Sequence, residues 1–162
     1  MSKYYFDEET ANKAVQFIET HLTHTKGELA KKPFILQEYQ KEQIIKPLFG
    51  WKNKEDDSRK YRTAFIFLPR KNGKSTLAAA IILTLLYLDQ EYGAEYYSAA
   101  NDKEQAKIVY SVVADMVKNN PKLESYVEIF KNSIVYNAQG SFYKAISRET
   151  STKHGFNTSA FI

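Results

Sequence analysis

The stretch Thr63-Ala64-Phe65-Ile66-Phe67-Leu68-Pro69-Arg70-Lys71-Asn72-Gly73-Lys74-Ser75-Thr76 decides the fold of this chain. Its first six residues are mostly apolar and predict a short buried strand over 63–68. A loop follows, and an Ala- and Leu-rich segment then predicts a long helix over 74–89. A strand that leads through a tight loop into a helix is the geometry that binds a phosphate, because backbone N–H groups at a helix N-terminus point at the anion.

Three residues of this stretch have the types that a nucleoside triphosphate and its Mg²⁺ require. Gly73 lets the backbone approach the phosphates closely, Lys74 can bridge the β- and γ-phosphates, and the Ser75 hydroxyl can bind Mg²⁺. Asn72 and Thr76 flank them and complete the expected contacts. The segment 69–76 is therefore predicted to be a phosphate-binding loop.

The match to the usual phosphate-loop pattern is incomplete, because Leu68 stands where that pattern has its first glycine, five positions before Gly73. The alternative is a surface turn in which Ser75 caps the helix and the lysines are solvated. Arg70 and Lys71 place two further cations beside the loop, which a capping turn does not require.

The rest of the chain alternates between predicted helices and strands. Helices are expected over 7–24, 37–48, 74–89 and 103–118, and strands over 63–68, 95–100, 133–137 and 142–147. The polar stretch 52–60 is expected to be a solvated loop. This order predicts an α/β fold with a mainly parallel sheet flanked by helices.

Composition narrows the class of protein. The 162 residues are 43% hydrophobic and 26% charged, so the chain can bury a core, and its net charge of +4 permits contact with polyanions. It contains no cysteine, which excludes a disulfide framework and thiolate metal sites. No apolar run is long enough for a signal peptide or a membrane span, and the histidines lack metal-ligand spacing. We expect a soluble intracellular protein.

The sequence resembles the ATPase domain of the large terminase subunit of tailed bacteriophages, a family of DNA-packaging motors. Their phosphate loop deviates as this one does, with the first glycine replaced and an arginine three positions before the second, as at Arg70. The segment Phe34-Ile35-Leu36-Gln37-Glu38-Tyr39-Gln40 resembles the family's adenine-recognising motif. The likeness continues at Phe17-Ile18-Glu19, His24-Thr25-Lys26-Gly27-Glu28, Ile44, Ile45, 48–51 and 99–106.

The resemblance implies a RecA-like P-loop NTPase fold of the ASCE type that binds ATP and Mg²⁺. It implies that Gln40 reads the adenine edge and that Arg70 contacts the γ-phosphate. Taken alone, Gln40 would be an exposed helix residue and Arg70 a solvated loop residue. Lys74 and Arg70 are the expected catalytic residues, with Ser75 at the metal. The expected nucleotide contacts are Gln40, Arg70, Lys71, Asn72, Gly73, Lys74, Ser75 and Thr76.

ATP hydrolysis also needs an Asp for Mg²⁺ and a Glu for the attacking water at the end of a neighbouring strand. Asp89 follows an apolar run but comes at the far end of the helix that the loop opens. Asp115 and Glu128 are expected in a helix or a loop and not at the end of a strand, so they do not meet this requirement either. Residues 153–162 resemble the approach to the family's acidic motif. We therefore expect an adenine-binding helical segment over 1–50 and an ATPase core over 51–162 that stops before the acids. We expect weak or no ATP turnover from this chain, and no nuclease domain.

The resemblance also implies partners: double-stranded DNA bound without sequence preference, the portal protein, the small terminase subunit and further copies in a ring. The setting would be the cytoplasm of an infected bacterium.

A mildly basic segment near the end of the chain either contacts DNA phosphates or is simply solvated; it contains Lys144, Arg148, Lys153 and His154. Two rival functions stay open: another P-loop enzyme such as a helicase or nucleotide kinase, and a DNA- or portal-binding module with a vestigial loop.

Overall fold

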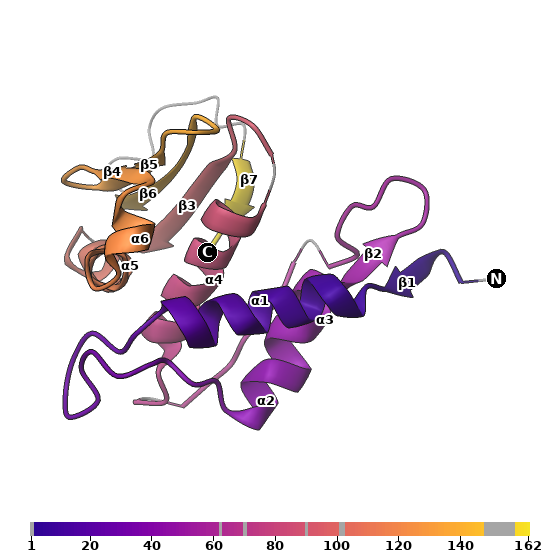
Figure 1. The fold of residues 1–162 in the computed structure, drawn as a ribbon, viewed down its shortest axis with the longest axis horizontal. Helices are drawn as coiled ribbons and strands as arrows, with labels where there is room; N and C mark the ends of the chain where they lie inside the picture. The colour runs from indigo at the N-terminus through magenta and orange to yellow at the C-terminus, as the bar shows by residue number, and fades with distance from the viewer. Residues whose placement is uncertain (1, 62, 70, 90, 101–102, 148–157) are drawn as a thin grey trace.

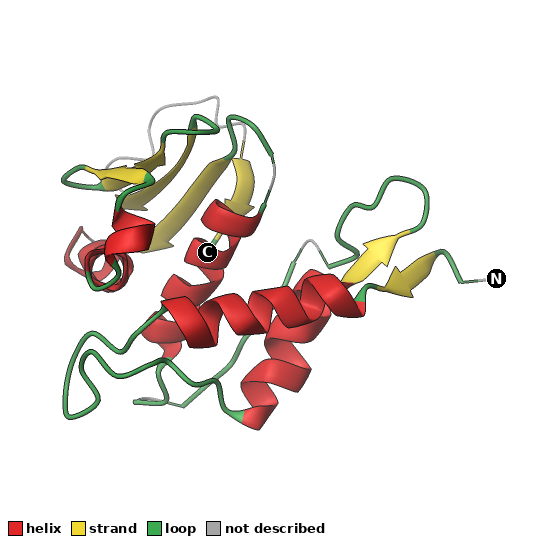
Figure 2. Ribbon diagram, in the orientation of Figure 1, coloured by secondary structure: helices red, strands yellow, loops and turns green. Residues whose placement is uncertain are grey.

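The computed structural model describes residues 2–61, 63–69, 71–89, 91–100, 103–147 and 158–162 (Figure 1). The helical elements are α1 (Glu8–His21), α2 (Glu38–Gln40), the π-helical turn η1 (Lys41–Ile45), α3 (Lys46–Gly50), α4 (Lys74–Leu88), α5 (Lys103–Lys118) and α6 (Pro121–Glu124). The strands are β1 (Tyr4–Phe6), β2 (Trp51–Asn53), β3 (Glu95–Ala100), β4 (Val127–Ile129), β5 (Ser133–Tyr136), β6 (Ser141–Ser147) and β7 (Thr158–Phe161). The α/β class is confirmed, with the main sheet at one end and α1 to α3 at the other (Figure 2).

The main sheet is mixed, so the expectation of a mainly parallel sheet is wrong. Its strand order is β4-β5-β6-β3-β7. β3 pairs in parallel with β6 and with β7, whereas β4 with β5 and β5 with β6 are antiparallel. The antiparallel half follows from chain length, because short turns join β4 to β5 and β5 to β6, and a short turn can only return the chain antiparallel.

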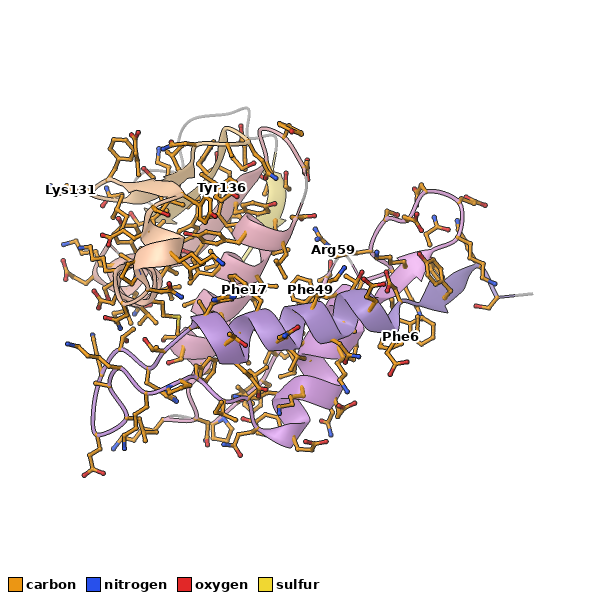
Figure 3. The ribbon with its side chains drawn as sticks, viewed as in Figure 1. Phe6, Phe17, Phe49, Arg59, Lys131 and Tyr136 are labelled. Carbon is orange, nitrogen blue, oxygen red and sulfur yellow. The ribbon has the colours of Figure 1, made fainter. Side chains whose placement is uncertain are left out.

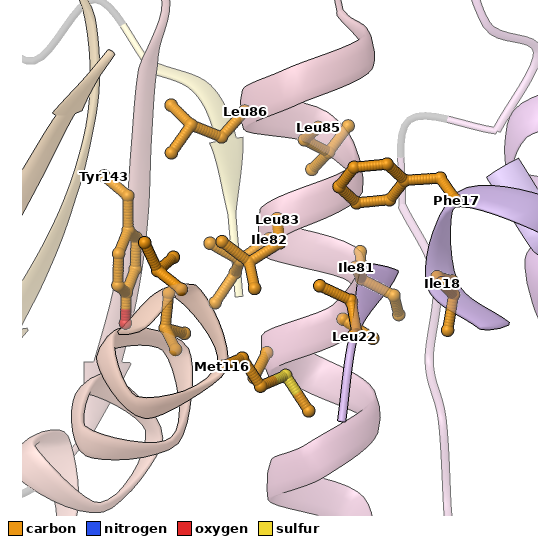
Figure 4. Close-up of a cluster of buried hydrophobic side chains, with 14 of the residues drawn as sticks. Phe17, Ile18, Leu22, Ile81, Ile82, Leu83, Leu85, Leu86, Met116 and Tyr143 are labelled. Atoms are coloured by element: carbon orange, nitrogen blue, oxygen red, sulfur yellow. The ribbon is translucent and has the colours of Figure 1, made fainter. Parts of the chain in front are cut away.

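The core is built around α4. Its residues are apolar on every side of the helix, so other elements can pack against all of its sides. It contacts α1 on one flank and α5 and β6 on the other. Figure 4 shows Phe17, Ile18 and Leu22 packing toward α4 from the α1 side. On the opposite flank, Met116 and Tyr143 close the same cluster. The cluster joins the helical end of the molecule to the sheet through one helix.

The helices predicted for the first 50 residues are present in the structure. The stretch 52–60, which follows them, differs from its prediction. The helices expected over 7–24 and 37–48 are present, the second with a π-helical turn at its centre. The stretch 52–60 is more ordered than a solvated loop. Lys52 pairs with Asp7, and Lys60 Nζ lies 4.5 Å from the centroid of the Trp51 ring. The stretch also begins within β2, which forms an antiparallel pair with β1 that the sequence did not predict.

The predicted buried strand over 63–68 is also wrong. The structure assigns no strand to residues 63–69, and the side chains of Phe65 and Phe67 are 91% and 83% exposed. Ile66 and Leu68 alternate with them and pack against the core. The alternation is that of a strand, but both neighbouring positions beside β3 are taken by β6 and β7, so the segment has no ladder partner there.

Candidate functional site

The phosphate loop adopts a backbone that few side chains tolerate. Gly73, the residue before α4, has φ +69°, and Lys71 two positions earlier has φ +66°. A glycine is suited to the first of these positions because it has no Cβ to clash in the left-handed region. The chain can therefore turn sharply from the extended segment 63–69 into α4, as the motif requires.

The N-terminus of α4 differs from those of α1 and α6 in having no side-chain cap. Asp7 caps α1, where Glu8 and Glu9 add negative charge to the first turn, and Asn120 caps α6. Gly73 offers no side chain, and the first turn of α4 holds no acidic residue. The first N–H groups of a helix have no intrahelical acceptor, and the helix dipole makes this end positive. This end of α4 is thus electrostatically suited to an anion.

The cationic residue predicted to serve the phosphates lies at the same place. Lys74 is exposed, and its Nζ donates a hydrogen bond to the Leu68 carbonyl oxygen at 3.0 Å, across the mouth of the loop. Lys71 and Asn72 are also exposed, and Ser75 and Thr76 are half-buried in the first turn.

The remaining predicted loop contact, Arg70, lies outside the described residues, as do Asn101 and Asp102 of the 99–106 segment. The structure thus brings six of the eight predicted nucleotide contacts into one turn of chain, 71–76.

Gln40, the predicted adenine reader, has a local structural role in this structure. Its side chain is 4% exposed, and its Oε1 accepts a hydrogen bond from the Gln37 backbone N–H at 2.8 Å. This bond fixes the start of α2, directly before the π-helical turn. No hydrogen bond connects Gln40 with loop residues 68, 69 or 71–75 in the described part of the chain. The alternative interpretation of Gln40 as an exposed helix residue is therefore wrong.

Asp89 is held by two partners and lies far from the loop. Arg59 Nη1 donates to Asp89 Oδ2 at 2.8 Å, and the Tyr96 hydroxyl donates to the same oxygen at 3.3 Å. Burial, with Asp89 nearby, raises the pKa of Tyr96, so the hydroxyl keeps its proton. Since Gly73 and Asp89 flank the two ends of α4, they are about 24 Å apart along the helix axis.

Arg59 is a structural residue that sequence reasoning missed. It joins the segment after β2 to the far end of α4 (Figure 3). A separation of 30 residues left no local signal of this pair. Glu128, expected in a helix or loop, lies in β4.

Two further features bear on function: clusters of side chains that could bind a metal ion, and helices that could span a membrane. No group of three or more His, Asp or Glu side chains is placed to hold a metal ion among those residues. No helix described here is both long and apolar enough to cross a membrane. Lys144 is exposed on β6, whereas Arg148, Lys153 and His154 lie outside the described residues.

Comparison with known proteins places this geometry in a family. The profile described as "Terminase large subunit, ATPase domain" matches residues 38–162. The large terminase subunit of Enterobacteria phage HK97 is 30% identical over 148 residues, which are 90% of this chain and 28% of that protein. The crystal structure of the HK97 large terminase is similar, with a TM-score of 0.76, 29% identity and coverage of 91% of this chain and 29% of the other. The chain spans less than a third of the length of these relatives. It belongs to the family of terminase large subunits, within their ATPase domain.

Proposed function

We propose that this chain is the nucleotide-binding part of an ATPase that moves double-stranded DNA during phage genome packaging. One observation carries the proposal: within the region that matches the terminase ATPase domain, α4 starts without a side-chain cap or an acidic residue and with Lys74 beside it. A triphosphate supplies the negative charge that this end of α4 lacks.

The residues present fit ATP and Mg²⁺ at the loop. A Cβ on Gly73 would meet nothing within 4 Å, so no other group crowds the loop at this residue. Lys74 would leave the Leu68 carbonyl for the β- and γ-phosphates, and the Ser75 hydroxyl would hold the metal. Arg70, Lys71, Asn72 and Thr76 complete the proposed contacts, with Arg70 at the γ-phosphate. Bound Mg²⁺ would neutralise phosphate charge.

Gln40 is the proposed adenine contact, within a helical segment 1–50 that precedes an ATPase core over 51–162. Its Oε1 is engaged by Gln37, so the amide nitrogen is the group that would donate to the base. Adenine recognition would then use the buried position of Gln40, which fixes the direction of that donor.

The proposed partners follow from the family: DNA gripped through its backbone, the portal protein, the small terminase subunit and further copies in a ring, in the cytoplasm of an infected bacterium. For the 162-residue chain we propose weak or no turnover. Asp89, which follows an apolar run, is paired with Arg59 at the end of α4 opposite Gly73 and is not placed to hold Mg²⁺ at the loop.

Calorimetric titration with ATP and Mg²⁺ tests nucleotide binding. We expect the native chain to bind, and Lys74→Ala to bind on the order of ten-fold or more weakly, because a charge-assisted contact to phosphate is lost. Lys107→Ala is the matched control, since Lys107 is paired with Glu104 on α5. Equal binding by the native and Lys74→Ala proteins, or none by either, would favour the rival of a non-enzymatic module. Fast Mg²⁺-dependent phosphate release from the chain would contradict the proposed weak turnover.

A further inference from the structure

A closed loop over 23–33 presents three exposed lysines: Lys26, Lys31 and Lys32. Thr23 and Pro33 form a bridge at its base, and the His24 N–H donates to the Lys32 carbonyl oxygen at 2.9 Å. The His24 ring packs edge-on against Phe34, with 5.1 Å between the ring centroids. Burial lowers the pKa of His24, so its ring adds no charge near neutral pH. The lysines therefore project from a backbone that is held in place.

Two asparagines at the junction of α5 and α6 bond to the start of this loop and to the end of α1, which precedes it. Asn119 Nδ2 donates to Thr23 Oγ1 at 3.0 Å, and Asn120 Nδ2 donates to the His21 carbonyl oxygen at 3.0 Å. The loop and the two helices lie at the same side of the molecule, at the left in Figure 1. The junction contributes two more exposed lysines. The lysine face is defined as Lys26, Lys31, Lys32, Lys118 and Lys122.

Ion pairs with acidic side chains neutralise several lysines of the chain but none on the lysine face among the described residues. Lys13, Lys41 and Lys107 each pair with a glutamate within 3 Å. The structure records no ion pair for the five lysines of the face among the described residues. The two segments, 23–33 and 118–124, hold five lysines against two carboxylates, Glu28 and Glu124. Most of the chain's net charge of +4 can thus be assigned to 18 residues.

We propose that the lysine face contacts the phosphate backbone of double-stranded DNA, an inference that rests on the proposed function. Ammonium groups attract phosphates as point charges without reading bases, which suits a protein that must hold any sequence. The two segments contain no Phe, Tyr or Trp, the side chains on which single-stranded bases stack. The chemistry of the face therefore favours the duplex over a single strand.

The test compares two triple variants with the same net charge. The first, Lys26→Gln/Lys32→Gln/Lys122→Gln, removes charge from the face. The second, Lys13→Gln/Lys46→Gln/Lys107→Gln, removes lysines that are paired with Glu9, Glu42 and Glu104. Binding of a mixed-sequence DNA duplex is measured by fluorescence anisotropy at several salt concentrations, with thermal unfolding as the check on folding.

Each phosphate contact contributes about −0.9 to the slope of log K against log salt concentration. We expect the first variant to have a slope shallower by about 2 to 3, and affinity at low salt lower by on the order of ten-fold or more. The control should keep the native slope. Equal slopes in all three proteins, loss of slope in both variants, or no duplex binding by the native protein would overturn the inference. Binding of heparin is measured as a test of general affinity for polyanions. A first variant that binds heparin more weakly but binds the duplex as the native protein does would also overturn the inference. ATP titration of the same preparations tests the proposed function separately, because Lys74 is unchanged in every variant.

Discussion

At the scale of single residues, substitutions of Gly73 can distinguish the cost of a left-handed backbone from the cost of a larger side chain. A Cβ at this position meets nothing within 4 Å, so substitution costs only the energy of φ +69°. We expect Gly73→Ala to lower the free energy of unfolding by about 1 kcal/mol. Gly73→Asn, which is larger but tolerates this region better, should lose less. Chemical denaturation gives both values; a greater loss for Asn than for Ala would show that bulk matters instead.

Asp7 is a second residue with a defined energetic signature. A hydrogen bond from Lys52, followed by those from Thr10, holds the pKa of its carboxyl well below its usual range. The ionised form is therefore favoured by folding, and its contribution is complete above the unfolded pKa of about 3.9 and is lost as pH falls toward the folded pKa. At pH 7, Asp7→Asn should be less stable by about 1 kcal/mol. Unfolding measured across acidic pH should show this difference shrinking; a constant difference would contradict the assignment.

At the scale of elements, α4 is a helix whose interior positions are all packed and whose last residue is not. Leu83 is 0% exposed, whereas Leu88 is 41% exposed. Leu83→Ala should lower the free energy of unfolding by about 3 kcal/mol, because it leaves a cavity in the core around α4. Leu88→Ala, the same change on the same helix, should cost less than about 1 kcal/mol. Urea denaturation of the two variants checks this, and similar losses would mean that α4 is not the centre of the core.

At the scale of the whole molecule, residues 63–69 form an extended segment with one apolar side in contact with the core and the other exposed. Phe67 is 83% exposed, and Ile66 packs against the core. Phe67→Ser should change the free energy of unfolding by no more than about 0.5 kcal/mol and improve solubility, since exposed apolar patches promote association. Ile66→Ser should lower stability by at least about 1 kcal/mol. Denaturation and light scattering separate these effects, and the reverse order would contradict the observed alternation.

The features of the candidate site that could be predicted from the sequence are those set by neighbouring residues. Gly73, Lys74 and Ser75 occupy consecutive positions, so the sequence could predict both a helix start at Lys74 and an exposed cation beside it. Gln40 was harder, because burial and the bond to Gln37 depend on how α2 packs. Arg59 could not be found, because the charge that it pairs with is contributed by Asp89, at the end of another element.

The sequence by itself determined α1, the helical segment from α2 to α3, α4, α5 and the strands β3, β5 and β6, because each depends on periodicity or on neighbouring residues. Only the tertiary structure decided whether an extended stretch becomes a strand. A strand needs a partner to complete its hydrogen bonds, so 158–161 pairs with β3 whereas 63–69, with a more apolar sequence, stays unpaired. The lysine face has the same origin, since Asn119 and Asn120 join lysines from segments nearly 100 residues apart.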